Sequence, residues 1–203
     1  MARTGKKYRD ILTTAKDLFW KHGFKRVSVE EICQKANVSK MTYYKYFPNK
    51  TALAKTVFNR VVEDGEKQFR KIMKEDTAAA EKLEKIILLK MEGTNSISPE
   101  FLQDFYTGSE PELKAFVEER TKKSWDLLIN DFRRAQEEGI FRRDFKPEFM
   151  VKLQNMFLSL LQDQSLIAMF ETRQELIMEF VNLMIYGISP RNNQSTDTYT
   201  SNT

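Results

Sequence analysis

Cysteine and histidine are nearly missing from this chain of 203 residues, which contains one of each. A single cysteine excludes an internal disulfide, and this scarcity of thiols suits a reducing cytoplasm. The sequence also lacks a His-Cys cluster, an HExxH motif and a nucleophile motif, which are the usual signatures of metal and hydrolase sites. We therefore predict a cytoplasmic protein that is not an enzyme and that needs no cofactor and no metal.

Long apolar runs and glycine-rich loops are missing as well. The most apolar stretch, residues 149–170, is interrupted by charged and amide side chains, so we do not expect it to span a membrane. The basic start, MARTGKKYRD, has no apolar run behind it and is not expected to be a secretory signal. Without strands, repeats or a phosphate-binding loop, the pattern favours a helical protein.

Charge is distributed unevenly along the chain. Residues 1–60 contain 14 Lys and Arg against 4 Asp and Glu, a balance of +10, whereas residues 61–203 contain 19 against 25, a balance of −6. A basic end on an otherwise acidic protein is typical of proteins that bind a phosphate backbone. A solvated basic face gives the same count, so charge alone leaves both interpretations open.

Residues 23–50 have the pattern of two short helices joined by a tight turn. Apolar side chains recur three or four apart in residues 27–36, which begin with a Ser-x-x-Glu capping box. Asn37 suits a left-handed turn, and Ser39 is placed to cap the second helix, residues 40–47. That helix is too short and polar to be stable alone, so its neighbours must hold it. We interpret the pair as a helix-turn-helix that reads DNA.

The rest of the chain has helical periodicity. Helices are expected over residues 7–22, 49–74, 78–92, 111–138, 147–170 and 172–186, with a short element after Pro99. Gly65 lies inside one long helix, where glycine costs roughly 1 kcal/mol relative to alanine, so it marks a close contact or a bend. The polar tail, residues 190–203, has no periodicity and is predicted to be disordered.

The N-terminal part resembles the DNA-binding domain of the TetR family of bacterial transcriptional regulators. The residues that carry this resemblance are Ala15, Leu18, Phe19, Gly23, Phe24, Val27, Ser28, Val29, Ile32, Ala36, Val38, Ser39, Tyr44, Tyr46, Phe47, Lys50 and Leu53. So many spaced matches are far more specific than a lone helix-turn-helix pattern. Asn37 stands where the family often has glycine, and asparagine is a reasonable substitute in a left-handed turn.

The resemblance implies a fold and a separate role for each of two domains. We expect an all-α protein with an N-terminal three-helix helix-turn-helix DNA-binding domain over residues 1–50. The helix over residues 49–74 links it to a larger helical ligand-binding and dimerisation domain over residues 51–189. The expected function is that of a repressor that binds a palindromic operator as a homodimer and is released by a small-molecule effector.

The expected DNA contacts follow from the geometry of a helix-turn-helix, whose second helix meets base edges in the major groove. Lys40 and Thr42 are the best candidates for base contacts, and Tyr43 is a further one. The candidates for phosphate contacts are Ser28, Tyr44, Lys45 and Lys50. Ser39, which caps the second helix, is a further candidate for contact with DNA. Taken singly, Lys40 and Lys45 fit a solvated surface better than a DNA contact, and Tyr44 and Tyr46 also fit a packed core.

The C-terminal helices are expected to supply the dimer interface and the effector site. The candidate interface residues are Phe157, Leu160, Leu161, Ile177, Phe180, Val181 and Met184, although an ordinary monomer core has the same composition. The candidate pocket residues are Met91, Phe105, Tyr106, Trp125, Phe132 and Asn155, although such residues at helical spacing also form cores. The effector's identity is left open by the sequence. An alternative function is that of a ligand-independent dimeric protein that binds DNA or recruits a partner.

Overall fold

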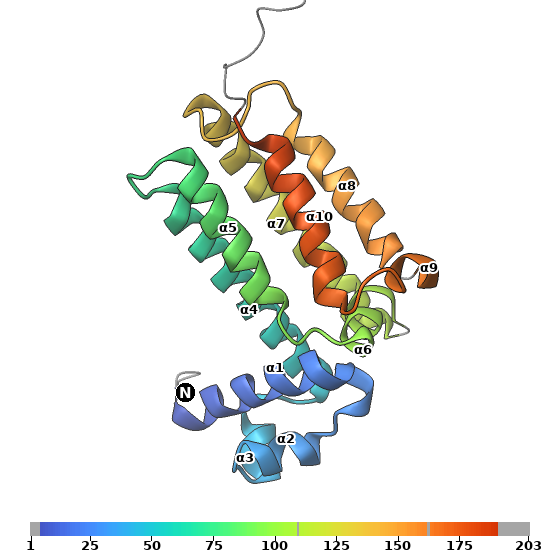
Figure 1. The fold of residues 1–203 in the computed structure, drawn as a ribbon. Helices are drawn as coiled ribbons and strands as arrows, with labels where there is room; N and C mark the ends of the chain where they lie inside the picture. Colours follow the sequence, from blue (N-terminus) through green and yellow to red (C-terminus); the bar gives the residue numbers. More distant parts are fainter. Residues whose placement is uncertain (1–4, 109, 162, 191–203) are drawn as a thin grey trace, which may run out of the picture.

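The computed structural model describes residues 5–108, 110–161 and 163–190, and over these ranges it contains helices and no strand. In chain order the elements are α1 (Lys6–Arg26), α2 (Val29–Lys35), α3 (Lys40–Tyr46), α4 (Lys50–Met73), α5 (Ala79–Thr94), α6 (Pro99–Leu102), the π-helical turn η1 (Gln103–Thr107), α7 (Pro111–Glu137), α8 (Pro147–Leu160), α9 (Gln164–Ile167) and α10 (Arg173–Ile188). Figure 1 shows α1, α2 and α3 together at one end and an elongated bundle of α4, α5, α7, α8 and α10. The predicted all-α fold class is confirmed.

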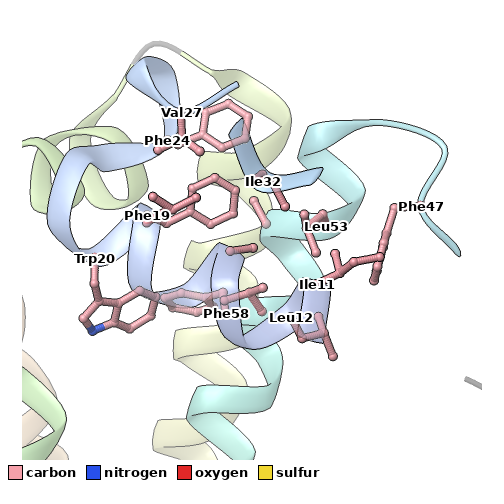
Figure 2. Close-up of a cluster of buried hydrophobic side chains, with 14 of the residues drawn as sticks. Ile11, Leu12, Phe19, Trp20, Phe24, Val27, Ile32, Phe47, Leu53 and Phe58 are labelled. Carbon is pink, nitrogen blue, oxygen red and sulfur yellow. The ribbon is translucent and has the colours of Figure 1, made fainter. Parts of the chain in front are cut away.

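One apolar cluster holds the N-terminal end together (Figure 2). Ile11, Ala15 and Phe19 recur every four residues on α1, so they point to one side of the helix and are fully buried there. Ile32 of α2 and Leu53 of α4 are equally buried against them. Burying an aliphatic or aromatic side chain of this size stabilises a fold by about 1.5–3 kcal/mol. This packing fixes two helices that are too short to be stable alone.

Aromatic rings continue this cluster into the bundle. Trp20 of α1 packs on Phe101 of α6 with their ring centroids 4.2 Å apart, and Trp20 O accepts a hydrogen bond from Ser98 N at 2.9 Å. Phe105 of η1 is fully buried between Phe19, Phe58 and Phe101. The start of the bundle and the N-terminal helices therefore share one core.

Gly23 lies at the centre of this junction. Its φ is +77°, and a Cβ added there would lie 2.7 Å from Asp104 Oδ2 and 2.8 Å from Glu100 Cβ. The same Asp104 oxygen accepts a hydrogen bond from Lys25 N at 2.9 Å. Only glycine combines this backbone conformation with so close an approach, so the end of α1 is fastened to α6 and η1.

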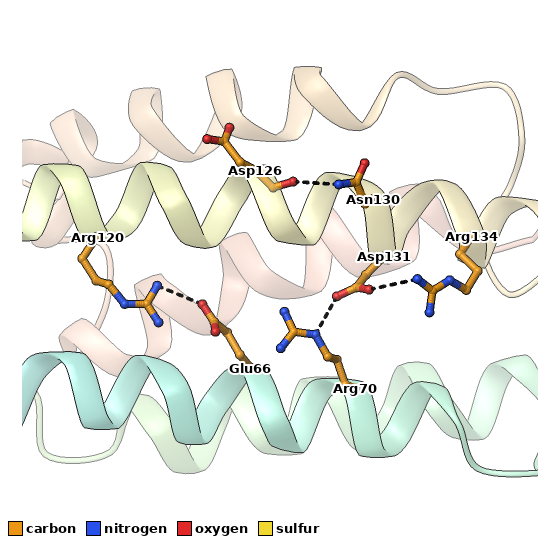
Figure 3. Close-up of polar contacts among 7 residues, drawn as sticks. All are labelled: Glu66, Arg70, Arg120, Asp126, Asn130, Asp131 and Arg134. Carbon is orange, nitrogen blue, oxygen red and sulfur yellow. Dashed lines mark hydrogen bonds and ion pairs between the residues drawn. The ribbon is translucent and has the colours of Figure 1, made fainter.

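Charged side chains join α4 to α7 along the bundle (Figure 3). Arg120 Nη1 lies 3.0 Å from Glu66 Oε1, and the two side chains are only 11% and 10% exposed. Arg120 Nε also donates to Asn59 Oδ1 at 2.7 Å. Further along, Arg70 Nε pairs with Asp131 Oδ2 at 3.1 Å. These contacts hold α4, which leads from the N-terminal helices into the bundle, against α7.

Three predicted helix bounds are corrected. The first helix continues past Gly23 to Arg26, although Gly23 itself leaves helical geometry. The predicted helix over residues 147–170 is two helices, because the Asp163 side chain caps a new helix after α8 ends. The last helix passes its predicted end and reaches Ile188.

The predicted disordered tail begins at Pro190, and residues 191–203 lie outside the described residues. Within the described ranges, every helix is too short or too polar to cross the hydrocarbon core of a membrane.

Candidate nucleic-acid interface

The turn between α2 and α3 is built by local side-chain chemistry. Ser28 Oγ caps α2 by accepting a hydrogen bond from Glu31 N at 3.1 Å, and Ser39 Oγ caps α3 by accepting one from Thr42 N at 3.1 Å. Asn37 has φ 52°, which confirms the predicted left-handed turn. These three residues set the angle at which α3 leaves the protein.

One face of α3 points away from the core. Lys40, Met41, Tyr44 and Lys45 are all exposed on it. Met41 is 84% exposed, the highest value among the large apolar residues, and Tyr44 is 53% exposed. Removing an apolar side chain from water is favourable. An exposed methionine in this position is therefore typical of a surface that a binding partner covers. Sequence reasoning missed Met41, although its place directly after the cap and Lys40 could have marked it.

Lys40 is held at the edge of this face by an acidic residue of α2. Its ammonium pairs with Glu30, and both side chains are more than half exposed. The hydrogen bond to Glu30 raises the pKa of Lys40, and the corresponding bond from Lys40 lowers the pKa of Glu30. Lys40 is thus fully charged and oriented, but its charge is partly neutralised by Glu30 in the free protein.

The structure corrects the prediction for Tyr43. Its side chain is fully buried, and its hydroxyl donates to Asn49 O at 3.4 Å. Burial raises the pKa of Tyr43 well above its ordinary value. A side chain in this position packs α3 onto the core and does not meet a base edge.

Thr42 lies beside the exposed face of α3. It is half-buried, and its Oγ1 lies 3.0 Å from Ser39 Oγ. Its hydroxyl already has a partner inside the protein, so Thr42 is less available to bases than the sequence suggested. Ser28 and Ser39 are exposed caps, which leaves both of these hydroxyls close to the surface that α3 presents.

Lys50 was predicted to contact a phosphate, and the structure gives it an internal role. Its Nζ donates to Phe24 O and Val27 O, both at 2.8 Å, and lies 4.3 Å from the Phe24 ring centroid. Burial lowers the pKa of Lys50. Lys50 therefore ties the start of α4 to the carbonyls at the end of α1.

The six predicted effector-pocket residues do not lie together. Phe105 and Tyr106 belong to the N-terminal cluster, and Trp125 and Phe132 belong to a second cluster inside the bundle. Met91 and Asn155 are exposed. The predicted set is corrected, because packing divides it between two cores and the surface.

The predicted dimer-interface residues are likewise divided. Phe157, Leu161 and Ile177 are buried in a third cluster inside the protomer, against which Phe180 and Val181 pack. Met184 packs against the second cluster, and Leu160 is 44% exposed. Other apolar side chains of the same helices are more exposed: Phe149 58%, Met156 61%, Leu183 67% and Tyr186 68%. Most of the residues predicted for the interface therefore face the interior of the protomer.

Comparison with known proteins agrees with this geometry. The family model described as "Bacterial regulatory proteins, tetR family" matches residues 11–57, which run from the second turn of α1 through α2 and α3 into α4. The uncharacterized HTH-type transcriptional regulator YdgC of Bacillus subtilis (strain 168) is 25% identical over 190 residues, which cover 90% of this chain and 93% of that protein.

Solved structures share the whole fold. The fatty acid degradation regulator FadR from Bacillus halodurans superposes with a TM-score of 0.67 at 20% identity, covering 94% of this chain and all of that one. The reduced form of NemR from E. coli gives a TM-score of 0.67 at 14% identity, covering 92% of this chain and 100% of that chain. At these identities the likeness concerns the fold, which is matched over the whole length of both proteins.

Proposed function

We propose, from the premise that this chain belongs to the TetR family of DNA-binding transcriptional regulators, that it is a cytoplasmic repressor. It binds a palindromic operator as a homodimer and is released by a small-molecule effector. The observation that carries the proposal is the exposed face of α3, which combines two lysines, a tyrosine and a methionine on a capped helix outside the core. We place the DNA-binding domain at residues 1–50 and the effector and dimerisation domain at residues 51–189.

In this proposal α3 enters the major groove. Lys40 leaves Glu30 and turns to the O6 and N7 acceptors of guanine, and Met41 contacts a thymine methyl group. Tyr44 and Lys45 bind the phosphates on either side, together with the Ser28 and Ser39 hydroxyls. The charge balance of residues 1–60 supports this assignment, because a basic surface lowers the free energy of a bound polyanion.

Selection of bound fragments from random DNA tests the proposal. A palindrome is the expected product, and its affinity is expected to fall steeply with added salt, because each phosphate contact releases counterions. Lys40→Ala is expected to change the preferred sequence at one position of each half-site. Lys45→Ala is the matched control, because it is expected to weaken all sequences alike. A flat salt response, or selection without any palindrome, would contradict DNA reading by a dimer.

The homodimer is proposed from the outer faces of α8 and α10. Phe149, Met156 and Leu160 recur at intervals of seven and four on α8, so they form one exposed apolar stripe. Leu183 and Tyr186 extend the apolar surface on α10, which lies beside α8 in Figure 1. Exposed apolar patches of this kind mark protein interfaces, and a two-fold axis through them would place two copies of α3 on one operator.

Sedimentation of the full chain tests the dimer. Met156→Glu, at the centre of the stripe, is expected to give a monomer with weakened operator binding. Leu88→Glu changes a residue that is 51% exposed on α5, away from the stripe, and is expected to leave the dimer intact. A dimer that survives Met156→Glu unchanged would remove α8 from the proposed interface.

Effector release is proposed to act through the junction at Gly23 and Asp104. A ligand that favours a different position of α6 and η1 would turn α1, and with it α3, relative to the bundle. Operator affinity measured with and without a saturating effector tests this step. Unchanged affinity would favour the ligand-independent alternative.

A further inference from the structure

The segment that connects α1 to α2, residues 23–27, is held from two sides. It begins where Gly23 leaves helical geometry, and it ends just before Ser28, which caps α2. Phe24 and Val27 of this connecting segment are buried in the N-terminal cluster. Its backbone N–H and C=O groups need partners from elsewhere, because the last carbonyls of a helix have none inside that helix. The direction of the segment sets the direction in which α2 and α3 continue.

On one side the partner is a carboxylate of η1. Asp104 is only 6% exposed, and its Oδ2 accepts a hydrogen bond from Lys25 N at 2.9 Å. Gly23 permits this approach, because a Cβ at residue 23 would lie 2.7 Å from the same oxygen. A backbone donor of the connecting segment is therefore bonded to an anion of the bundle.

On the other side the partner is the ammonium of Lys50. Its Nζ donates to Phe24 O and Val27 O, both at 2.8 Å, and to Lys25 O at 3.5 Å. Three carbonyls account for all three N–H donors of an ammonium, which leaves none for a DNA phosphate. Burial lowers the pKa of Lys50, whereas the Glu110 and Asp104 carboxylates act in the opposite direction. The acceptors of the connecting segment are therefore bonded to a cation of α4.

The two ions lie in elements that belong to the bundle. Asp104 is in η1 and Lys50 is the first residue of α4, while the connecting segment leads to α3. The segment can turn only if these bonds break, and charge-assisted hydrogen bonds are roughly twice as strong as neutral ones. In a homodimer the angle between α3 and the bundle decides how far apart the two copies of α3 lie. The distance between the half-sites on DNA must match that separation.

We propose that Lys50 and Asp104 are positioning residues, which fix the half-site spacing that the homodimer accepts by holding residues 23–27 between them. This inference rests on the proposed function, and it replaces the phosphate contact predicted for Lys50. One added base pair moves a half-site by about 3.4 Å along the DNA axis and rotates it by about a tenth of a turn. A firmly held α3 cannot follow this displacement, whereas a loosely held α3 can.

Operators with altered spacing test this role on the full chain. The palindrome selected from random DNA is compared with versions that have one base pair inserted or removed at the centre. The wild-type protein is expected to bind the altered operators at least about tenfold more weakly, since a misplaced half-site loses base contacts. Lys50→Met keeps the side-chain length but removes the charge, and it is expected to reduce this ratio by about three- to tenfold. Asp104→Asn is expected to reduce the ratio from the other side of the segment.

Salt dependence distinguishes positioning from phosphate binding. The logarithm of affinity falls with the logarithm of salt concentration by about 0.9 for each phosphate contact. Lys50→Met is expected to leave this slope unchanged. Lys45→Met, the control on the exposed face of α3, is expected to make the slope shallower by about 1.8 in a dimer and to weaken all spacings alike.

A charged substitute at the same position completes this test. Lys50→Arg keeps the charge but replaces the compact ammonium with a wider planar group, so it is expected to relax the spacing preference as Lys50→Met does. A shallower slope for Lys50→Met, together with normal binding by Lys50→Arg, would show that Lys50 contacts a phosphate and would overturn the proposal.

Stability measurements distinguish positioning from a purely structural role. Circular dichroism shows whether each variant is folded at the temperature of the binding assay. If Lys50→Met does not fold, Asp104→Asn provides the same test. Lys21→Met removes a charge from the exposed side of α1 and is expected to keep the wild-type spacing ratio. Folded variants of Lys50 and Asp104 that melt earlier but also keep the wild-type ratio would overturn the proposal.

The selected DNA separates this inference from the function on which it rests. Selection without any palindrome overturns both. A palindrome that the wild-type protein binds equally well at every spacing overturns only the positioning role, because DNA reading by a homodimer would remain.

Discussion

The DNA-binding end and the bundle differ in how their interiors are filled. The first is packed around one apolar cluster that runs from Tyr8 to Val117, whereas the bundle interior is divided into two smaller clusters, and ion pairs of largely buried side chains join α4 to α7. Close-packed cores have one arrangement, while loosely filled ones have several of similar free energy. The difference suits a rigid DNA-binding end attached to a bundle whose conformation can change when a ligand binds.

Arg120→Ala is the largest expected disruption of the bundle. It would leave the Glu66 carboxylate buried without its main partner, which costs about 3–5 kcal/mol of unfolding free energy. Urea unfolding followed by circular dichroism measures this loss. Lys114→Ala, on the same helix, removes an exposed pair with Glu118 at 3.8 Å and is expected to cost about 0–1 kcal/mol. Equal costs for the two variants would mean that the α4–α7 ion pairs do not support the bundle.

The same carboxylate gives the bundle a dependence on acid. Burial raises the pKa of Glu66, but hydrogen bonds from Arg120 and Ser124 and the charges of Arg120 and Arg70 outweigh it, so the pKa lies below its ordinary value. A lowered pKa means that the stabilisation is present above the unfolded-state pKa and is lost as the pH falls through the folded-state value. Glu66→Gln is expected to reduce this acid-dependent loss of stability.

Gly23→Ala is expected to loosen the junction between the two parts. The positive φ costs about 1–3 kcal/mol for a residue with a Cβ, and displacement of Asp104 adds to this cost. Gly139→Ala is the matched control, because Gly139 has φ +74° but nothing within 4 Å of an added Cβ. The difference in melting temperature between the two variants isolates the contact with Asp104. If the melting temperature falls equally in both variants, the close contact between residue 23 and Asp104 does not contribute to stability.

The comparison also separates what local sequence predicts from what it does not. The capping residues Ser28 and Ser39 and the left-handed Asn37 were predictable, because each acts on its own neighbours in the chain. The burial of Tyr43 and the internal bonds of Lys50 were not, because they depend on which face of α3 and α4 meets α1. The sequence pattern predicted the helix-turn-helix itself, but tertiary packing decided which of its side chains face the solvent.

The bundle was less predictable for the same reason. Helical periodicity identified nearly all of its helices, yet a stripe of apolar residues is read in the same way whether it faces a core, a ligand or a second protomer. Phe157 was assigned to an interface, although its ring stacks on that of Phe180 inside the protomer with the centroids 3.9 Å apart. Only the arrangement of helices distinguishes these cases.

Ser39→Ala tests how far DNA binding by α3 depends on the N-terminal cap of this helix. Loss of an N-cap costs about 0.5–2 kcal/mol, and α3 has only seven residues over which to absorb it. We expect a small fall in melting temperature and a larger fall in operator affinity, because α3 frays at the end that meets the bases. Thr172→Ala removes the cap of α10, a helix of 16 residues, and is expected to leave operator affinity unchanged. Equal effects of the two variants on DNA binding would contradict a local role for Ser39.

Glu30→Gln is expected to have the smallest effect on DNA affinity, and this effect is confined to the helix-turn-helix. Glu30 holds Lys40 in the free protein and places a negative charge where a phosphate backbone would approach. Its removal is expected to raise affinity for all DNA sequences by about two- to fivefold, the range of an exposed ion pair, and to lower the ratio of specific to non-specific binding. Competition binding at several salt concentrations measures both.

The neighbouring residue Glu31 provides the control for this charge. Glu31 pairs with Lys35 on the same helix at 3.0 Å, so Glu31→Gln changes the net charge equally without releasing Lys40. If both variants raise non-specific binding equally, the effect is one of net charge alone. If only Glu30→Gln lowers the ratio of specific to non-specific binding, Glu30 increases specificity through its ion pair with Lys40. A base edge must then compete with the Glu30 carboxylate for the Lys40 ammonium.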